Sequence, residues 1–324
     1  MYRIGMADTP SNSPVLVIGA TGRHGNTGAH VVRRLREEGH PVRVLARQLS
    51  DRTDRLRELG ADVVIGDLHQ RASLAPALAD VDRVYFTYPI AAGVVSAAAN
   101  YAAAVREVDR HPRTVVMSMG PARADHPSDL GKGQWLAEQV LEWAGLDLVI
   151  LRVAATFHPN ILVLHGQSIR EHDVIRNSFG VGPVPWISGQ DAGELGVTAL
   201  LHPERFPKTV NYPLGSELFT HPEIAALLSE LLNRPIRFEP VTKEQWREEL
   251  IALSEKTGAE VVNPAMAQHI SSVGHGIARN GVGPGADPAT LQDLIGRPPV
   301  TLRSFLEANL DAFSALAPAA PATR

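Results

Sequence analysis

The sequence contains no cysteine among its 324 residues. Disulfide bonds, thiolate nucleophiles and cysteine-based zinc sites are therefore excluded. It also lacks an H-E-x-x-H pattern or a comparable metal-ligand spacing, so we predict no metal site. The absence of cysteine fits a reducing compartment, and the first residues lack the apolar segment of a secretory signal. We therefore expect a cytoplasmic protein.

Long apolar runs and basic clusters are missing as well. No run approaches the roughly 20 apolar residues that a membrane-spanning helix needs, so we expect no membrane partner. The net charge is −4, and no lysine- or arginine-rich run stands out. Bulk charge thus gives no support for nucleic-acid binding. With 44% hydrophobic residues, the chain can bury the core of one large domain or of two fused domains.

What the sequence does contain is a repeated alternation of short apolar segments and amphipathic segments. The first amphipathic segment places Val31, Val32 and Leu35 on one helical face. The apolar segments are nearly continuous, which is typical of parallel strands covered by helices on both faces. Right-handed crossovers then make the sheet doubly wound. We predict an α/β fold: a doubly wound, parallel-sheet Rossmann domain with a smaller, partly helical C-terminal lobe.

The character of the chain changes after about residue 156, where proline, histidine and glycine become frequent. We predict a dinucleotide-binding Rossmann domain over residues 13–156, with a later segment, about 184–215, as a candidate for return to it. Residues 157–313 are predicted to form a substrate-binding lobe. Residues 1–12 and 314–324 are predicted to be flexible tails.

A glycine-rich turn separates the first predicted strand from the first helix. Gly19, Gly22 and Gly25 form a G-x-x-G-x-x-G loop, and Gly28 follows. Glycine lets the backbone approach a pyrophosphate, and the free N–H groups at a helix start attract it. The alternative is a turn that needs glycine only for its backbone conformation or packing. Its place between a first strand and a first helix favours dinucleotide binding.

The residue after the second predicted strand indicates which dinucleotide is bound. An acidic residue at this place accepts the ribose hydroxyls of NAD(H). Here Arg47 occupies it, with Arg43 in the strand and Arg23 in the loop. A guanidinium pairs with the 2′-phosphate of NADP(H), so we predict NADP(H) ahead of NAD(H), against the alternative of a surface arginine. Asp67 either accepts from the adenine amino group or caps the next turn.

Seven segments in order resemble the NmrA-like branch of the atypical short-chain dehydrogenases/reductases, from about residue 14 to residue 313. They read "VLVIGATG", "GHPVRVLAR", "GADVVIGDL", "VVMSMG", "AEQVLEWAGLDLVILR", "GPVPWISGQDAGE" and "LIGRPPVTLRSFL". That family includes NADP(H)-dependent quinone and phenylpropanoid reductases. It also includes redox-sensing regulators that bind the dinucleotide without turning anything over.

The resemblance implies roles by position. The implied cofactor-binding residues are Gly19, Thr21, Gly22, Arg23, Gly25, Arg47, Asp67, Leu68, Thr87, Tyr88 and Pro89. The implied substrate-binding residues are Ala155, Thr156, Phe157 and Asn160. Trp186 is a further substrate-binding candidate, although core packing is the default for a tryptophan. Ser118 corresponds to the serine at the end of the fifth strand, with a buried hydroxyl bonded to the backbone as the alternative.

The sequence departs from the family in two places. The loop reads as though three residues were added, so that either Gly25 or Gly28 opens the first helix. There is no Tyr-x-x-x-Lys pair, and Gln134 stands where reductase members have a lysine at the start of a helix. Gln134 carries no charge and cannot act as a general acid. The catalytic candidates are therefore Ser118, Gln134 and the nearby Lys132.

Three functions remain open. The first is an NADPH-dependent oxidoreductase that transfers a hydride to a quinone-like or other conjugated small molecule, for which solvent can supply the proton. The second is a non-catalytic NADP(H)-binding redox sensor or regulator. The third is a biosynthetic enzyme that uses the fold without hydride transfer. A small-molecule substrate is the expected partner, and a dimer is one option for the oligomeric state.

Overall fold

The computed structural model describes residues 13–22, 25–108, 110–258, 261–281 and 285–314. The predicted tail 1–12, all but one residue of the predicted tail 314–324, and Arg23 lie outside these ranges. Within them the chain divides into two compact units. Unit 1 takes its residues from 13–124, 133–152 and 192–212, and unit 2 takes its residues from 125–132, 153–191 and 213–314.

Unit 1 is built on a parallel sheet of seven strands in the order β10-β6-β5-β4-β1-β2-β3. Their bounds are β1 Val15–Ile18, β2 Val42–Ala46, β3 Asp62–Ile65, β4 Arg83–Thr87, β5 Arg113–Met119, β6 Leu148–Val153 and β10 Val210–Asn211. The strand order reverses at β1, which pairs in parallel with both β2 and β4. This reversal creates the crevice at which doubly wound folds bind ligands. The predicted fold class is confirmed.

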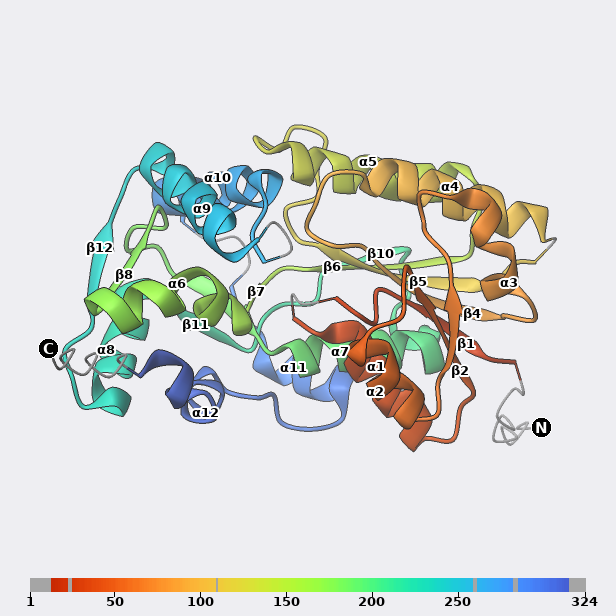
Figure 1. The fold of residues 1–324 in the computed structure, drawn as a ribbon, viewed down its shortest axis with the longest axis horizontal. Coiled ribbons are helices and arrows are strands. Elements are labelled where there is room, and N and C mark those ends of the chain that lie inside the picture. The colour runs from red at the N-terminus through yellow and green to blue at the C-terminus, as the bar shows by residue number, and fades with distance from the viewer. Residues whose placement is uncertain (1–12, 23–24, 109, 259–260, 282–284, 315–324) are drawn as a thin grey trace, which may run out of the picture. The chain divides into compact units, whose positions relative to one another are not determined.

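Helices cover both faces of this sheet (Figure 1). They are α1 Thr27–Glu37, α2 Asp51–Glu58, α3 Ala75–Leu78, α4 Val94–Glu107, α5 Asp129–Trp143 and α7 Gly189–Leu201, with the 3₁₀ turns Arg71–Ser73 and Pro203–Arg205. Alternate residues of a strand point to opposite faces of a sheet. Val84 and Phe86 of β4 accordingly join the core beneath α4, whereas Tyr85 lies against Gly196 of α7.

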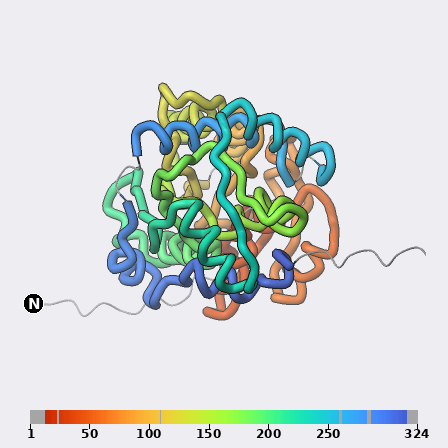
Figure 2. Tube along the Cα trace, turned by 90° about the vertical axis from the view of Figure 1, so that its left-hand side faces the viewer, coloured from red at the N-terminus to blue at the C-terminus, as the bar shows by residue number. Residues whose placement is uncertain are grey.

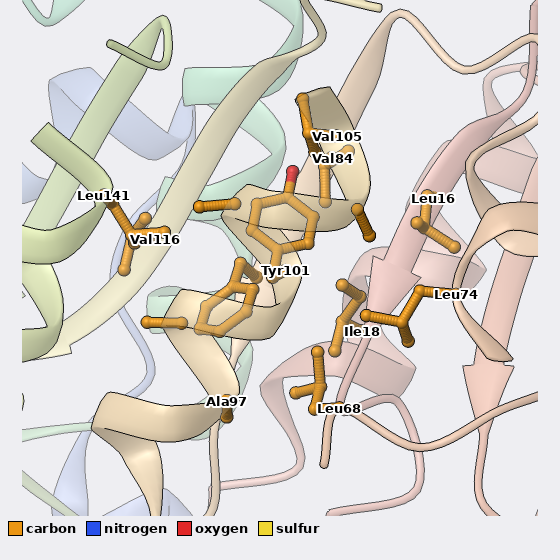
Figure 3. Packing of buried hydrophobic residues seen from close by; sticks show 14 of the residues in the cluster. Leu16, Ile18, Leu68, Leu74, Val84, Ala97, Tyr101, Val105, Val116 and Leu141 are labelled. Carbon is orange, nitrogen blue, oxygen red and sulfur yellow. The ribbon is translucent and has the colours of Figure 1, made fainter. Parts of the chain in front are cut away.

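The core on the α4 face is organised around Tyr101. Its ring lies 5.1 Å from that of Phe86, and its hydroxyl is 2.7 Å from the Thr114 hydroxyl, so the buried phenol is both packed and hydrogen-bonded. Figure 3 shows Tyr101 among Val84, Val105 and other apolar side chains. This core holds β1, β4 and β5 in place beneath the polar residues at their carboxyl ends.

The later part of the chain returns to unit 1 through α7. The carboxylate of Glu194 lies 2.8 Å from His30 Nε2 and accepts from Arg34 Nε at 2.7 Å, both on α1. Gly193 is needed at this approach, because a Cβ there would lie 2.7 Å from the His30 ring. The segment 192–212 then ends in β10, which pairs with β6 at the sheet edge.

Unit 2 contains a small sheet in the order β11-β9-β7 and a parallel pair of β8 and β12. The strands are β7 Thr156–Phe157, β8 Val174–Asn177, β9 Val184–Ile187, β11 Glu217–Phe219 and β12 Arg237–Pro240. The helices are α6 Pro159–His172, α8 His221–Leu232, α9 Lys243–Thr257, α10 Pro264–Asn280, α11 Pro288–Ile295 and α12 Leu302–Glu307, with a 3₁₀ turn at Leu310–Phe313. Figure 2 shows β12 as an extended teal segment at the front.

Aromatic rings and histidines form the core of unit 2. His221 lies 4.8 Å from the ring of Phe179 and 5.9 Å from that of Trp186, measured between ring centroids. Trp246 packs against Phe179 and stacks on His165. Burial lowers the pKa of His165 to about 4 and that of His221 well below its ordinary value. Both imidazoles are therefore neutral core residues at pH 7.

Candidate functional site

The glycine loop is wedged against the end of β4. Gly19 has a φ of +85°, and a Cβ on it would lie 2.5 Å from Thr87 Cγ2 and 2.7 Å from the Thr87 carbonyl oxygen. The N–H of Gly22 donates to the carbonyl oxygen of Gly19 at 3.1 Å, which closes the turn. Only glycine fits at residue 19, and the loop therefore lies at the β1–β4 switch point.

The first helix begins at Thr27 and not at Gly25. Gly25 and Asn26 both have positive φ, +69° and +53°, and so belong to the turn. Gly28 makes the close approach, because a Cβ on it would lie 2.8 Å from Ala20 Cα and 2.9 Å from the Gly19 carbonyl oxygen. The extra residues of the loop are accommodated before the helix, and Gly28 is the glycine that packs the helix against the loop.

The start of α1 offers backbone donors toward the loop. Asn26 precedes the helix without a side-chain hydrogen bond to it, and its first turn contains no acidic residue. The first N–H groups of a helix have no partner within the helix, and they carry its positive dipole end. Backbone N–H groups, the helix dipole and a glycine cradle together are the elements of a phosphate-binding site.

Two arginines near the end of β2 bear on cofactor binding. Arg47 follows β2 directly and is exposed. Arg52, in the first turn of α2, donates from Nη1 to the carbonyl oxygen of Thr21 at 2.7 Å. Nothing in the sequence marks Arg52 as a contact of the loop, because it lies in a generally charged helix. Arg43 has a different role, since it bonds to Asp62 and to the carbonyl oxygen of Ala79 at 2.7 Å. Arg43 is therefore a structural residue.

The residues after β3 and β4 form a compact polar cluster. Asp67 accepts the N–H of His69 at 2.9 Å, so it does cap the turn that follows β3. The Tyr88 hydroxyl lies 2.8 Å from His69 Nε2 and donates to the Ala92 carbonyl oxygen at 3.1 Å. Burial raises the pKa of Tyr88, against the opposing effect of Arg47. Tyr88 is a fixed, half-buried phenol at pH 7.

The other predicted contacts in this region differ in exposure. Leu68 is buried, and its carbonyl oxygen accepts from Asn100 at 2.8 Å. Thr87 is half-buried against Gly19, and Pro89 is exposed. The end of β4 thus places Thr87 against Gly19 of the glycine loop, with Tyr88 directly after it, and Asp67 and Leu68 follow β3. Their individual roles in cofactor binding stay predictions.

Ser118 belongs to a buried polar network. Its hydroxyl donates to Glu138 Oε1, and Glu138 Oε2 accepts from Arg152 Nε at 2.9 Å and from Arg152 Nη2. Arg152 also donates to the Tyr212 hydroxyl, and its guanidinium lies 5.4 Å from the centre of that ring. Burial raises the pKa of Glu138, whereas the hydrogen bonds from Arg152 and Ser118 lower it. Ser118 is buried, as the structural alternative expected, but its hydroxyl bonds to a carboxylate and not to the backbone; its catalytic role stays a prediction.

The helix that carries Gln134 begins earlier than predicted. α5 starts at Asp129, because the Ser128 hydroxyl accepts the N–H of Gly131 at 3.1 Å and caps the first turn. Gln134 is therefore inside the helix, where it is buried one turn before Glu138. The side chain of Lys132 is 51% exposed, with Asp129 Oδ1 at 3.8 Å. Lys132 lies in the first turn of α5 and Gln134 two residues further along, and their catalytic roles stay predictions.

The predicted substrate-binding residues all belong to unit 2. Thr156 and Phe157 form β7 and pair with Trp186 and Ile187 of β9. Ala155 precedes this pair and is half-buried. Trp186 is only 1% exposed, and its indole N–H donates to the Phe219 carbonyl oxygen at 3.3 Å. Packing already accounts for this tryptophan, and its proposed contact with a substrate stays a prediction.

Two unsatisfied polar side chains follow β7. Asn160, in the first turn of α6, has a buried Oδ1 with no hydrogen-bond partner among the described residues. His158 is fully buried, and neither of its ring nitrogens finds a partner within the described part of the chain. Burial lowers the pKa of His158 to about 4. Its imidazole is therefore neutral at pH 7 and energetically unfavourable.

Within the described ranges, no group of three or more histidines and carboxylates is placed to hold a metal ion. None of the helices in the part of the chain that the structure covers combines the length and the apolar character that crossing a bilayer requires.

The fold and the loop define a Rossmann-type α/β protein. The chain belongs to the NmrA-like family, whose model matches residues 11–273. It is 28% identical over 304 residues to an NAD(P)H azoreductase from Xenophilus azovorans, covering 93% of this chain and 99% of that protein. It is 31% identical over 305 residues to a (4-alkanoyl-5-oxo-2,5-dihydrofuran-3-yl)methyl phosphate reductase from Streptomyces griseus, with 93% and 99% covered.

A solved structure extends the comparison to three dimensions. The NADPH-dependent quinone oxidoreductase of Escherichia coli, in complex with NADPH, superposes with a TM-score of 0.73 at 19% identity, covering 92% of this chain and 99% of that chain. At this level of identity the similarity concerns the fold. The predicted resemblance to the NmrA-like family is confirmed.

Proposed function

We propose that this chain is an NADPH-dependent oxidoreductase that transfers a hydride to a conjugated small molecule. The observation that carries the proposal is the glycine cradle at the β1–β4 switch point, where Gly19 and Gly28 leave no room for a Cβ. A diphosphate needs this close backbone approach and the N–H groups at the start of α1.

The residues present fit NADP(H). The loop from Gly19 to Gly28 would hold the diphosphate, and Arg47 would meet the 2′-phosphate after β2. Thr87 and Tyr88, at the end of β4, would border the ribose and the nicotinamide. When bound, the reduced cofactor supplies a hydride from its nicotinamide ring. The chain's own part is to bind and orient it.

The relatives support a conjugated acceptor. One is named for the reduction of azo compounds, one for that of a conjugated dihydrofuranone phosphate, and the structural neighbour for that of quinones. Each name implies an electrophile that delocalises the incoming electron pair. Such an acceptor does not require a strong protein acid, which fits a chain without a Tyr-x-x-x-Lys pair.

A second candidate is a redox sensor that binds NADP(H) without turnover. The observation in its favour is that the hydroxyl of Ser118 is already engaged by Glu138. We also propose a cytoplasmic location and a small-molecule partner, as expected from the sequence, with a dimer as one option for the oligomeric state. Each of these proposals is tested by its own measurement.

The test combines binding and turnover. NADPH and NADH are titrated by cofactor fluorescence, and oxidation of NADPH is then followed with quinones, azo dyes and unsaturated lactones. Oxidation with at least one acceptor class supports the reductase. Tight NADPH binding with no oxidation across the panel would favour the sensor. No binding of either dinucleotide would reject both.

The identity of the cofactor is tested with Arg47→Glu. A charge-assisted contact to the 2′-phosphate is worth about 1.5–3 kcal/mol, so NADPH affinity should fall roughly tenfold to a hundredfold while NADH affinity changes little. Equal losses for the two cofactors would remove Arg47 from the 2′-phosphate site.

A further inference from the structure

The hydroxyl of Ser118 has a single proton, and this proton is engaged in a hydrogen bond to Glu138. The Ser118 hydroxyl donates to Glu138 Oε1. An ionised carboxylate has no proton to give back, whereas a hydroxyl oxygen keeps two lone pairs after its proton is engaged. Any other group that reaches the Ser118 oxygen therefore meets an acceptor.

Arg152 keeps the Glu138 carboxylate ionised and oriented by binding its second oxygen. This oxygen accepts two N–H groups of Arg152, and the carboxylate is only 1% exposed. Arg152 is in turn bonded to the Tyr212 hydroxyl. Two N–H groups of a guanidinium on one carboxylate oxygen favour the ionised form, against the rise in the pKa of Glu138 that burial causes, and they fix its orientation. The carboxylate therefore has little freedom to turn away from Ser118.

The position of Ser118 places this acceptor at the ligand edge of unit 1. Ser118 is the penultimate residue of β5, and β5 is the direct neighbour of β4. The last residue of β4, Thr87, touches Gly19 of the loop that would hold the diphosphate. In a doubly wound fold the bound dinucleotide crosses the carboxyl ends of these strands.

We propose that Ser118 acts as a hydrogen-bond acceptor for the reacting ligands, with Glu138 as its positioning residue, and that Ser118 is not the proton donor. This inference rests on the proposed binding of NADP(H). The group that Ser118 recognises is an N–H or O–H donor. Two sources carry one: the carboxamide of the nicotinamide, or an amino or hydroxyl substituent on the conjugated acceptor.

The reaction balances without a protein acid. When bound, NADPH would supply a hydride from C4 of its nicotinamide and leave as NADP⁺, and the acceptor would take up the electron pair and hydrogen and become an anion. The anion then takes its proton from water. Ser118 orients one of the partners through a lone pair, and its own proton stays with Glu138.

The cofactor arm of the test uses 3-acetylpyridine adenine dinucleotide phosphate, which lacks the two N–H groups of the carboxamide. NADP⁺ and this analogue are titrated calorimetrically into wild type and Ser118→Ala. One lost hydrogen bond corresponds to about a twofold to twelvefold change in affinity. The wild type should prefer NADP⁺ by this factor, and Ser118→Ala should abolish the preference. Ser168→Ala, a hydroxyl on α6 bonded to the His165 carbonyl oxygen, is the matched control.

The substrate arm identifies the other source. If the preference for NADP⁺ survives in Ser118→Ala, the KM of an azo dye with a hydroxyl beside the azo bond should rise, while that of unsubstituted azobenzene should not. General acid catalysis contributes roughly a hundredfold or more to a rate. A fall of that size in kcat, with unchanged KM values and an altered solvent deuterium isotope effect, would identify Ser118 as a proton donor and overturn the proposal. Unchanged binding and KM values in both arms would also overturn it.

Glu138→Gln tests the positioning role. A glutamine can donate to Ser118 as well as accept, so the acceptor state is no longer enforced. The preference found in either arm should shrink as it does in Ser118→Ala, and the double variant should be no worse than Ser118→Ala alone. Additive losses would make Glu138 a structural residue only.

Two further outcomes can be told apart from a failure of the proposal. Glu138→Gln leaves Arg152 without its ionised partner and can prevent folding; in that case the measurements on Ser118→Ala decide the proposal by themselves. If the wild type binds NADP⁺ in preference to the analogue, but none of the acceptors in the panel supports oxidation of NADPH, the proposed reductase is refuted. It would leave the acceptor role of Ser118 supported.

Discussion

The guanidinium of Arg52 donates to the backbone carbonyl of Thr21 at 2.7 Å. This bond ties the start of α2 to the middle of the glycine loop, because Arg52 lies in the first turn of that helix. The carbonyl of Thr21 is thereby directed toward Arg52. A backbone loop that must present N–H groups to a diphosphate benefits from a fixed carbonyl on its other side.

We expect Arg52→Ala to weaken NADPH and NADH alike. The substitution removes one hydrogen bond from a charged donor, and the loop loses part of its preorganisation. An affinity loss of about tenfold is expected for both cofactors, which corresponds to about 1.4 kcal/mol. Fluorescence titration of the two cofactors measures it, and Arg55→Ala, on the same helix and exposed, is the control. A selective loss of NADPH would instead assign Arg52 to the 2′-phosphate.

Gly28→Ala should destabilise the protein and impair dinucleotide binding. The new Cβ would lie within 3.0 Å of backbone atoms of Gly19 and Ala20, which cannot move as a flexible side chain can. Overpacking of this kind costs about 1–3 kcal/mol of unfolding free energy. Chemical denaturation with and without NADPH measures both effects.

Gly276→Ala is the opposite case and serves as the control for Gly28. Gly276 lies inside α10, and nothing stands within 4 Å of the Cβ that alanine would add. Alanine is favoured over glycine in a helix by about 0.8–1 kcal/mol, so this variant should be more stable than wild type. A stable Gly28→Ala variant with full affinity would show that the loop can shift to accept a side chain.

His158→Leu should stabilise the protein, and increasingly so toward acid pH. At pH 7.5 the substitution removes two buried nitrogens that lack partners in the described structure, a gain of about 1–3 kcal/mol. The pKa of His158 is lowered to about 4, so between pH 6.5 and 4 the unfolded chain binds a proton that the folded chain does not. Stability is therefore lost as the pH falls through this window, by up to about 3 kcal/mol for this residue.

Denaturation of His158→Leu and wild type at several pH values checks this. The difference in unfolding free energy should grow as the pH falls from 7 to 5. His111→Gln, at an exposed histidine, is the control for the loss of a histidine. A His158→Leu variant that is less stable at every pH would mean that the ring nitrogens of His158 have hydrogen-bond partners in solution, for instance buried water.

Periodicity in the sequence was sufficient for the alternation of strands and helices from β1 to β6, but it did not predict the edge strand β10. The glycine loop was also found at the end of β1, because a strand followed by glycines and an amphipathic segment is a local pattern. The start of α5 was missed because its cap is Ser128, without a glutamate or glutamine three residues later to complete a capping box. Only the structure shows that this serine bonds to the Gly131 N–H.

Interactions between side chains of different helices and strands could not be predicted from the sequence. Glu138 and Arg152 lie on a helix and on the following strand, and nothing in either segment marks them as partners. Arg43 was grouped with Arg47 as a candidate for the cofactor because the two are close in sequence. The pairing of β2 with β3 places Arg43 opposite Asp62, and this register decides its role.

The return of residues 192–212 has a consequence for how the protein is made. Unit 1 receives α7 and the edge strand β10 from this segment, and Glu194 binds both His30 and Arg34 of α1. During translation, the amino-terminal half therefore waits for residues 154–209, between β6 and β10, before its last strand emerges. A fragment that stops near residue 156 would lack that strand and expose the apolar side of β6, so it should aggregate or be degraded instead of forming a free-standing nucleotide-binding domain.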